Sequence, residues 1–160
     1  MAAPPYIAVC GPAVADDHEA AWAVEVGRWI AEAGAVLVCG GLGGVMDAAA
    51  GGAAVAGGTS IGILPGDGRA PASPHLTVAI PTGMGEARNA LVVRAADAVI
   101  AISGEFGTLS EIALALKMGK PVIGLGTWEL SKRGHPDDAI IRADSPQDAV
   151  ARALAAAGEA

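Results

Sequence analysis

A short segment in the second half of the chain carries the residues best suited to bind a phosphate. It runs from Ser103 to Glu111 with the sequence Ser-Gly-Glu-Phe-Gly-Thr-Leu-Ser-Glu. The apolar run 98–102 before it is typical of a buried strand, and apolar residues recur at helical spacing from Ile112 to Met118. A strand, a glycine turn and a helix start bring backbone N–H groups and the positive end of a helix dipole to one point. Such a point binds phosphate without basic side chains.

Within this segment we predict that Gly104, Gly107 and Thr108 surround the phosphate. Glu111 then lies one helical turn further along, about 6 Å at the usual rise per residue. From that position its carboxylate would reach the sugar of a nucleotide whose phosphate sits on Gly107 and Thr108. The alternative is an ordinary exposed carboxylate in the first turn of a helix, which stabilises the helix dipole by about 0.3–1 kcal/mol.

Arg88 and Asn89 stand near the start of a helix predicted over residues 86–95. Because this helix starts at the carboxyl edge of the predicted sheet, Arg88 would face the Gly104 turn. There it could pair with a phosphate or hold Glu111 ionised in a fixed orientation. The alternative for Arg88 is an ordinary surface arginine.

The residue pattern gives little support to other site chemistries. Three histidines are scattered, with no carboxylate or cysteine at ligand spacing, so we expect no metal site. A pyridoxal-phosphate enzyme needs a lysine in its site, but Lys117 and Lys120 fall at the far end of the helix that follows Thr108. No Gly-x-Ser-x-Gly nucleophile elbow occurs. We therefore expect no resident cofactor.

The elements that must position these residues alternate between strands and helices. Strands are predicted over 6–10, 35–39, 59–64, 76–80, 98–102, 121–125 and 139–142, and helices over 17–33, 45–55, 86–95, 108–118 and 146–157. Several strands are continuous apolar runs, which is typical of a parallel sheet covered on both faces. We predict an α/β fold, a single domain over residues 1–160 with a doubly wound, mainly parallel, Rossmann-like sheet and helices on both faces.

Ligands of such sheets bind beyond the carboxyl ends of the strands, where the winding reverses. The loops at that edge carry Gly11, Gly40–Gly44, Gly83–Gly85 and Gly104–Thr108. The Gly40–Gly44 loop has neither the spacing of the dinucleotide fingerprint nor the Lys-Ser/Thr pair of a triphosphate loop. It either allows a tight strand-to-helix turn and nothing more, or aims a second helix N-terminus at the same ligand.

Charge and hydropathy restrict the partners. The net charge is −7 with no basic run, so nucleic acid is not expected as a main partner. The uncharged stretch 48–66 contains six glycines and Pro65, so we do not expect it to span a membrane. The N-terminus has no basic n-region of a signal peptide. Cys10 and Cys39 fit buried thiols of a reduced cytosol, and we expect a cytoplasmic protein.

Four motifs together resemble the Lonely Guy superfamily of nucleotide phosphoribohydrolases, which activate cytokinins and were long misnamed lysine decarboxylases. The motifs are Gly40-Gly41-x-x-Gly44-x-Met46, Arg88 with its following polar residue Asn89, Ala96-Asp97-Ala98, and Gly104-x-x-Gly107-Thr108-x-x-Glu111. The resemblance runs from the first strand to about Leu125.

The resemblance implies a homodimer or homotetramer that cleaves the N-glycosidic bond of a nucleoside 5′-monophosphate, and not a lysine decarboxylase. It implies that Arg88 and Glu111 are catalytic and that Gly107 and Thr108 hold the phosphate. Further ligand-binding residues are expected in the same motifs and in the loop after the first strand: Gly11, Gly40, Gly41, Gly44, Met46, Asn89 and Gly104.

Some positions depart from that pattern. The family's Pro-Gly-Gly is Ser103-Gly104-Glu105 here, its Arg-Lys pair is Arg88-Asn89, and Pro12 replaces a small polar residue. With the stretches 43–48 and 61–65, these changes look closer to a sister branch that includes the molybdenum-cofactor carrier proteins. The alternative function is therefore a non-catalytic binder or carrier of a phosphorylated ligand such as molybdenum cofactor.

A third hypothesis is a purely structural oligomerisation domain. The helix that begins near Thr108 has apolar residues all round, which predicts burial on two sides. We expect this helix to pack in a subunit interface as well as on the sheet.

Overall fold

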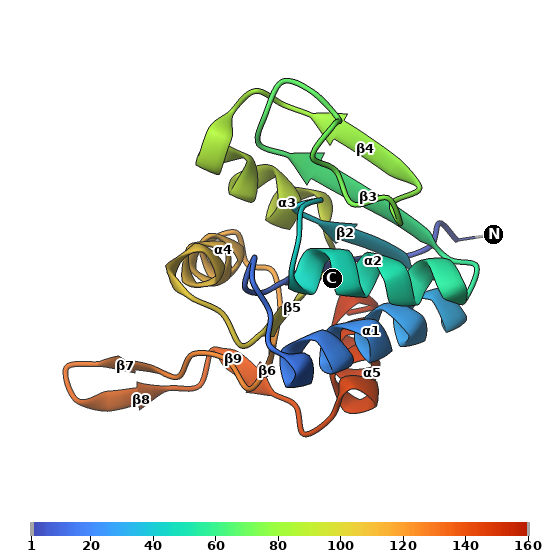
Figure 1. Cartoon of the computed structure of the whole chain (residues 1–160). Helices are drawn as coiled ribbons and strands as arrows, with labels where there is room; N and C mark the ends of the chain where they lie inside the picture. The colour runs from blue at the N-terminus through green and yellow to red at the C-terminus, as the bar shows by residue number, and fades with distance from the viewer. Residues whose placement is uncertain (1, 160) are drawn as a thin grey trace.

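Parallel strands form the middle layer of the structure, and helices cover both of its faces (Figure 1). The computed structural model describes residues 2–159. Within them the main sheet has seven strands in the order β4-β3-β2-β1-β5-β6-β9, and every neighbouring pair is parallel. Its strands are β1 (Tyr6–Cys10), β2 (Val36–Cys39), β3 (Thr59–Leu64), β4 (Val78–Pro81), β5 (Ala98–Ile102), β6 (Val122–Leu125) and β9 (Ile140–Arg142).

The helices divide between the two faces of this sheet. They are α1 (Asp17–Glu32), α2 (Val45–Val55), α3 (Asn89–Ala95), α4 (Phe106–Lys117) and α5 (Pro146–Ala157). In β1, Ile7 and Val9 pack in the core with α1, α2 and α5, whereas Ala8 and Cys10 pack in the core with α3 and α4. Continuous apolar strands therefore feed two cores, and the prediction of a doubly wound α/β fold is confirmed.

The first helix begins where the sequence places its start. The Asp16 carboxylate accepts a hydrogen bond from the Glu19 N–H at 2.8 Å, and the Glu19 carboxylate accepts one from the Asp16 N–H at 3.0 Å. This reciprocal capping box satisfies two backbone donors that the helix itself leaves without partners. At the other end, Gly34 takes a φ of +73°, which terminates the helix as predicted.

Glycines let α1 and α2 pack at very short range. A Cβ at Gly27 would lie 2.0 Å from the carbonyl oxygen of Ala49, and a Cβ at Gly52 would lie 2.0 Å from that of Val24. No side chain fits at such distances, so each helix approaches the other's backbone through a glycine.

Three elements differ from the prediction. The helix expected over 86–95 is a 3₁₀ turn, η1 (Gly85–Arg88), followed by α3, because Gly83 and Gly85 both have positive φ and delay the helix start. The strand expected over 76–80 begins at Val78, since Leu76 packs beside the core of α1 and α2 instead of extending the strand. A hairpin of β7 (Leu130–Lys132) and β8 (His135–Asp137) was not predicted, because its short strands contain almost no apolar residues.

None of the helices described over residues 2–159 combines the length and apolar character needed to cross a bilayer.

Candidate functional site

The winding of the sheet reverses between β1 and β5. The chain adds β2, β3 and β4 on one side of β1, and β6 and β9 on the far side of β5. Beyond the carboxyl ends of these two strands lies a cavity of about 620 Å³. Loops after β1, β2, β3 and β5 contribute to its wall. This is the position at which open α/β sheets bind ligands.

The start of α4 presents free backbone donors to this cavity. The Leu109 N–H donates to the Glu105 carbonyl at 3.0 Å, but in the described part of the chain the N–H groups of Phe106, Gly107 and Thr108 have no acceptor, and Glu105 does not cap the helix with its side chain. Gly107 and Thr108 line the cavity. Three free amides and the positive helix end favour an anion here.

The turn before α4 is held in an unusual conformation. Ser103 has a φ of +49° and Gly104 a φ of +108°. A Cβ on Gly104 would lie 2.4 Å from the Thr108 side chain, so glycine is required there. Ser103 keeps its strained conformation through a hydrogen bond from its hydroxyl to Glu19 at 2.5 Å and one to its carbonyl from the Thr127 hydroxyl. These contacts fix the direction of the α4 amides.

A hydrogen bond crosses the reversal point from β1 to α4. The Cys10 thiol donates to Oε2 of Glu111 at 2.8 Å, and both side chains are buried. Burial raises the pKa of Glu111, while the hydrogen bond from Cys10 and the nearby Arg88 guanidinium act against that rise. Burial also raises the pKa of Cys10, which keeps the thiol protonated as a donor. Glu111 is therefore not the exposed carboxylate of the alternative interpretation.

Arg88 is a buried cation whose Nε donor has no partner in the described residues. Its side chain lines the cavity, Nη1 donates to Oδ1 of Asn89, and its guanidinium lies against Gly40, where a Cβ would come within 2.8 Å of Nη2. An unpaired buried donor such as this Nε costs about 1–3 kcal/mol. The surface-arginine interpretation is wrong, and an anion in the cavity would satisfy this donor.

The buried Glu111 carboxyl predicts a pH-dependent stability. Because its folded pKa lies above the value of about 4.5 for the unfolded chain, the folded state binds the proton more tightly. Its contribution to stability is complete below pH 4.5 and is lost as the pH rises through the folded pKa. In urea titrations across pH, Glu111→Gln should therefore gain stability relative to wild type as the pH increases.

A second variant makes this expectation specific. Cys10→Ala removes the hydrogen bond that lowers the pKa of Glu111, so the pH window in which stability falls should extend upward. A difference between wild type and Glu111→Gln that does not change with pH would contradict the assignment.

The structure brings together most of the residues that the sequence singled out. The cavity is lined by seven of them: Gly11, Met46, Arg88, Asn89, Gly107, Thr108 and Glu111. Gly40 lies behind Arg88, whereas Gly41, Gly44 and Gly104 shape loops without forming the wall. At Gly44 a Cβ would lie 2.2 Å from the Pro12 carbonyl oxygen, so the β2–α2 loop packs tightly against the loop after β1.

One contact bears on the two interpretations of the β2–α2 loop. The Val45 N–H at the start of α2 donates to the Pro12 carbonyl at 3.0 Å. The first donor of α2 is thus used inside the protein, which favours a tight turn over a second anion site.

Eight further cavity residues were not among the ligand-binding residues expected from the sequence, although some lie in the glycine-bearing loops named there. They are Pro12, Ala13, Val14, Leu42, Pro65, Gly85, Glu86 and Glu105. Their signal was their position in the loops after strands, and Pro12 and Glu105 also stood out as departures from the family pattern. The apolar members give the cavity a surface that a flat ring can contact. The other charged members, Glu86 and Glu105, are acidic, so Arg88 is the sole cation in the wall that the structure describes.

Comparisons with known proteins agree with this architecture. A solved structure entitled as the molybdenum cofactor binding protein from the phototrophic bacterium Rippkaea orientalis is 36% identical, with a TM-score of 0.87 over 97% of this chain and 98% of that one. The molybdenum cofactor carrier protein of Chlamydomonas reinhardtii is 32% identical, with a TM-score of 0.85 over 98% and 99%.

An uncharacterized protein of Archaeoglobus fulgidus is 45% identical over 119 residues, which are 74% of this chain and 78% of the relative. The model of the SLOG cluster4 family matches residues 4–150. The resemblance noted in the sequence is confirmed at the level of the superfamily. With nearly its whole length matched, this chain belongs to the SLOG cluster4 family.

Proposed function

We propose that this protein binds and carries a phosphorylated pterin, the molybdenum cofactor, without converting it chemically. Two similar structures over nearly the full chain are of a protein named for binding this cofactor and a protein named for carrying it. The cavity at the β1–β5 reversal supplies what such a ligand needs at one end, since free amides of α4 and the Arg88 guanidinium suit a phosphate.

The rest of the cavity suits a flat, hydrogen-bonding heterocycle. Pro12, Leu42 and Met46 offer apolar surface for ring faces. Glu86 and Glu105 offer carboxylates, which accept hydrogen bonds when ionised. A pterin carries an aminopyrimidinone edge with two adjacent N–H donors. The two oxygens of one carboxylate can accept a hydrogen bond from each of them. Guanine shares this edge and adenine does not.

The observation that carries the non-catalytic proposal is the state of Glu111. A carboxylate that stabilises an oxocarbenium ion or activates water needs an oxygen free to face the reacting bond. Glu111 is only 8% exposed, and its Oε2 already accepts a hydrogen bond from the Cys10 thiol. Its geometry is that of a group that shapes the floor of the site.

The first test is the cargo itself. Protein purified from a host that makes molybdenum cofactor should release, after denaturation and oxidation, a stoichiometric amount of fluorescent pterin, with molybdenum detected by mass spectrometry. Apoprotein should bind GMP at least about tenfold more tightly than AMP, because the carboxylates pair with the guanine edge alone. Absence of pterin together with equal affinities for GMP and AMP would refute the proposal.

A phosphoribohydrolase is the second candidate, because Arg88 and Glu111 face one cavity. We expect no free base when wild-type protein and Glu111→Gln are incubated with AMP or GMP and the products are separated by chromatography. Release of base by wild type, abolished in Glu111→Gln, would establish the hydrolase instead.

We also propose a homo-oligomer in the cytoplasm. On the outer side of α4, Phe106 is 76% exposed, and Leu109 and Leu116 are half-buried along the same stripe. Cys10 and Cys39 are free thiols, which suits a reducing compartment. The solution mass that tests the oligomer is measured in the experiment described below.

A further inference from the structure

The β7–β8 hairpin extends away from the body of the protein (Figure 1). Its two strands pair with each other and form a sheet of their own. Of the strand residues only Leu130 is half-buried, and the rest are exposed. An isolated two-stranded hairpin is marginally stable in water, and its open edges can pair with another chain. A hairpin of this kind is suited to an interface.

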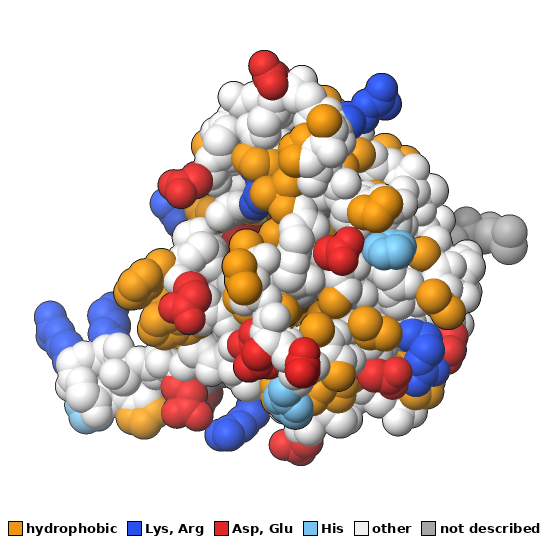
Figure 2. All heavy atoms as spheres, viewed as in Figure 1, with side chains coloured by type: hydrophobic (Ala, Val, Ile, Leu, Met, Phe, Trp, Pro, Cys, Tyr) orange, Lys and Arg blue, Asp and Glu red, His pale blue; other side chains and the backbone are white. Residues whose placement is uncertain are grey.

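Charge is distributed unevenly along the hairpin. Its free end carries Lys132, the last residue of β7, and Arg133 in the turn, and Lys132 pairs with His135 of β8. Its base borders a cavity of about 520 Å³ lined by Glu129, Asp137 and Asp138, with Arg142 as the only cation in that wall. Figure 2 shows Lys and Arg side chains at the free end and acidic side chains closer to the body. The tip thus has two positive charges, and the cavity at the base has a net charge of −2.

We propose that the hairpin joins two copies of this chain, with the basic tip of each hairpin seated in the acidic cavity of the other. When the two hairpins lie antiparallel, the tip of each one meets the base of the other. One two-fold axis therefore generates both contacts. A parallel arrangement would place like charges together. Within the described residues, neither Lys132 nor Arg133 forms an ion pair with its own chain, so both cations at the tip are available to a second copy.

The surface beside the cavity continues toward the ligand site. Trp128 lines the hairpin cavity and stacks against the exposed Phe106, with ring centroids 5.7 Å apart. Its indole N–H donates to the carbonyl of Glu105, which borders the ligand cavity. A hairpin bound here would lie next to the entrance of that site. The proposal does not depend on which ligand the site holds.

Two charge-reversal variants, one at the tip of the hairpin and one at its base, test this arrangement. One variant reverses the tip (Lys132→Glu with Arg133→Glu), and the other reverses the base (Asp137→Lys with Asp138→Lys). In sedimentation experiments at low salt, wild type should have at least twice the chain mass of 15.6 kDa. Each variant alone should associate at least about tenfold more weakly, because like charges then face each other twice. An equimolar mixture should restore association, since each tip then meets a base of opposite charge.

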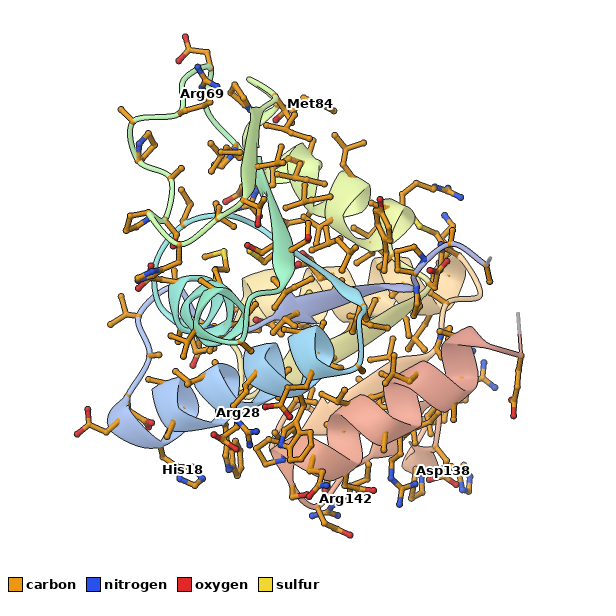
Figure 3. All side chains as sticks on the ribbon, turned by 90° about the vertical axis from the view of Figure 1, so that its right-hand side faces the viewer. His18, Arg28, Arg69, Met84, Asp138 and Arg142 are labelled. Atoms are coloured by element: carbon orange, nitrogen blue, oxygen red, sulfur yellow. The ribbon has the colours of Figure 1, made fainter. Side chains whose placement is uncertain are left out.

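The matched control reverses two charges far from the hairpin, Asp67→Lys with Arg69→Glu. Both residues are exposed, and Arg69 lies at the opposite end of the molecule from Asp138 (Figure 3). This control should associate like wild type, and circular dichroism should show all variants folded. A monomeric wild type, reversed variants with unchanged association, or a mixture that stays dissociated would each overturn the proposal. Absence of pterin in the purified protein would not change the expected association of wild type, reversed variants or their mixture. The carrier proposal and the hairpin proposal can therefore fail independently.

Discussion

Replacing Arg88 with alanine is expected to weaken binding of GMP or pterin phosphate about 100-fold, measured by titration calorimetry on the apoprotein. Arg88 is the one cation in the described wall of the ligand cavity, and its guanidinium is buried with Nε unpaired. Loss of a buried, charged hydrogen-bond donor costs about 2–5 kcal/mol of binding energy, which covers a factor of 100.

Matched variants separate charge from geometry. Arg88→Lys keeps the charge but loses the planar fork, so we expect an intermediate loss of about tenfold. Arg94→Ala removes an exposed arginine from the last turn of α3, the helix that Arg88 precedes, and should not change affinity. The stability of the apoprotein gives an independent readout. Because Arg88→Ala also removes an unsatisfied buried donor, it should cost the unliganded fold little. Unchanged affinity in Arg88→Ala would remove the anion site from this cavity.

Two neighbouring glycines in α2 should respond to alanine in opposite directions. At Gly52 a Cβ would lie 2.0 Å from the Val24 carbonyl oxygen, so Gly52→Ala must push α1 and α2 apart, at a cost of about 2–3 kcal/mol. At Gly51 the nearest atom to a Cβ is in the His75 ring at 3.5 Å, an ordinary contact. Gly51→Ala should stabilise by about 0.5–1 kcal/mol, because glycine is a poor helix former.

Urea denaturation measures both effects on the free energy of unfolding, provided that the slope with denaturant is unchanged. A further variant examines the cause. Gly27→Ala meets the Ala49 carbonyl oxygen from the other helix, so one separation of α1 and α2 relieves both clashes. The double variant with Gly52→Ala should therefore lose less than the sum of the single losses. Destabilisation of equal size by Gly51→Ala and Gly52→Ala would show that helix packing is not the cause.

The sequence was sufficient to predict the layers of the fold and the edge of the sheet at which the cavity lies. The apolar run at Ala98–Ile102 and the glycines around Gly104 placed α4 and its free amides correctly, because strand burial and turn chemistry are local properties. The start of α1 at Asp17 was equally local. Arg88 and Glu111 were identified by their loops and by resemblance, and the structure places both in one cavity wall.

What the sequence did not predict depends on contacts between distant residues. Cys10 looked like a small core residue, and its thiol hydrogen bond to Glu111 joins positions 101 residues apart. The role of Gly27 in α1 depends on which backbone crosses it, which no helical pattern contains. The β7–β8 hairpin has too little apolar character to be distinguished from a loop.

The double role of Glu19 has a consequence for the order of folding. One carboxylate oxygen caps α1, and the other holds Ser103 across 84 residues of chain. Thr127 must also arrive before the Ser103 carbonyl is held. Closing such long loops is slow. The turn at Ser103 and Gly104, which orients the α4 amides, therefore reaches its final conformation late in folding. During synthesis, a growing chain would therefore be unable to form the anion site at the start of α4 until β6 has emerged and Thr127 has docked on Ser103.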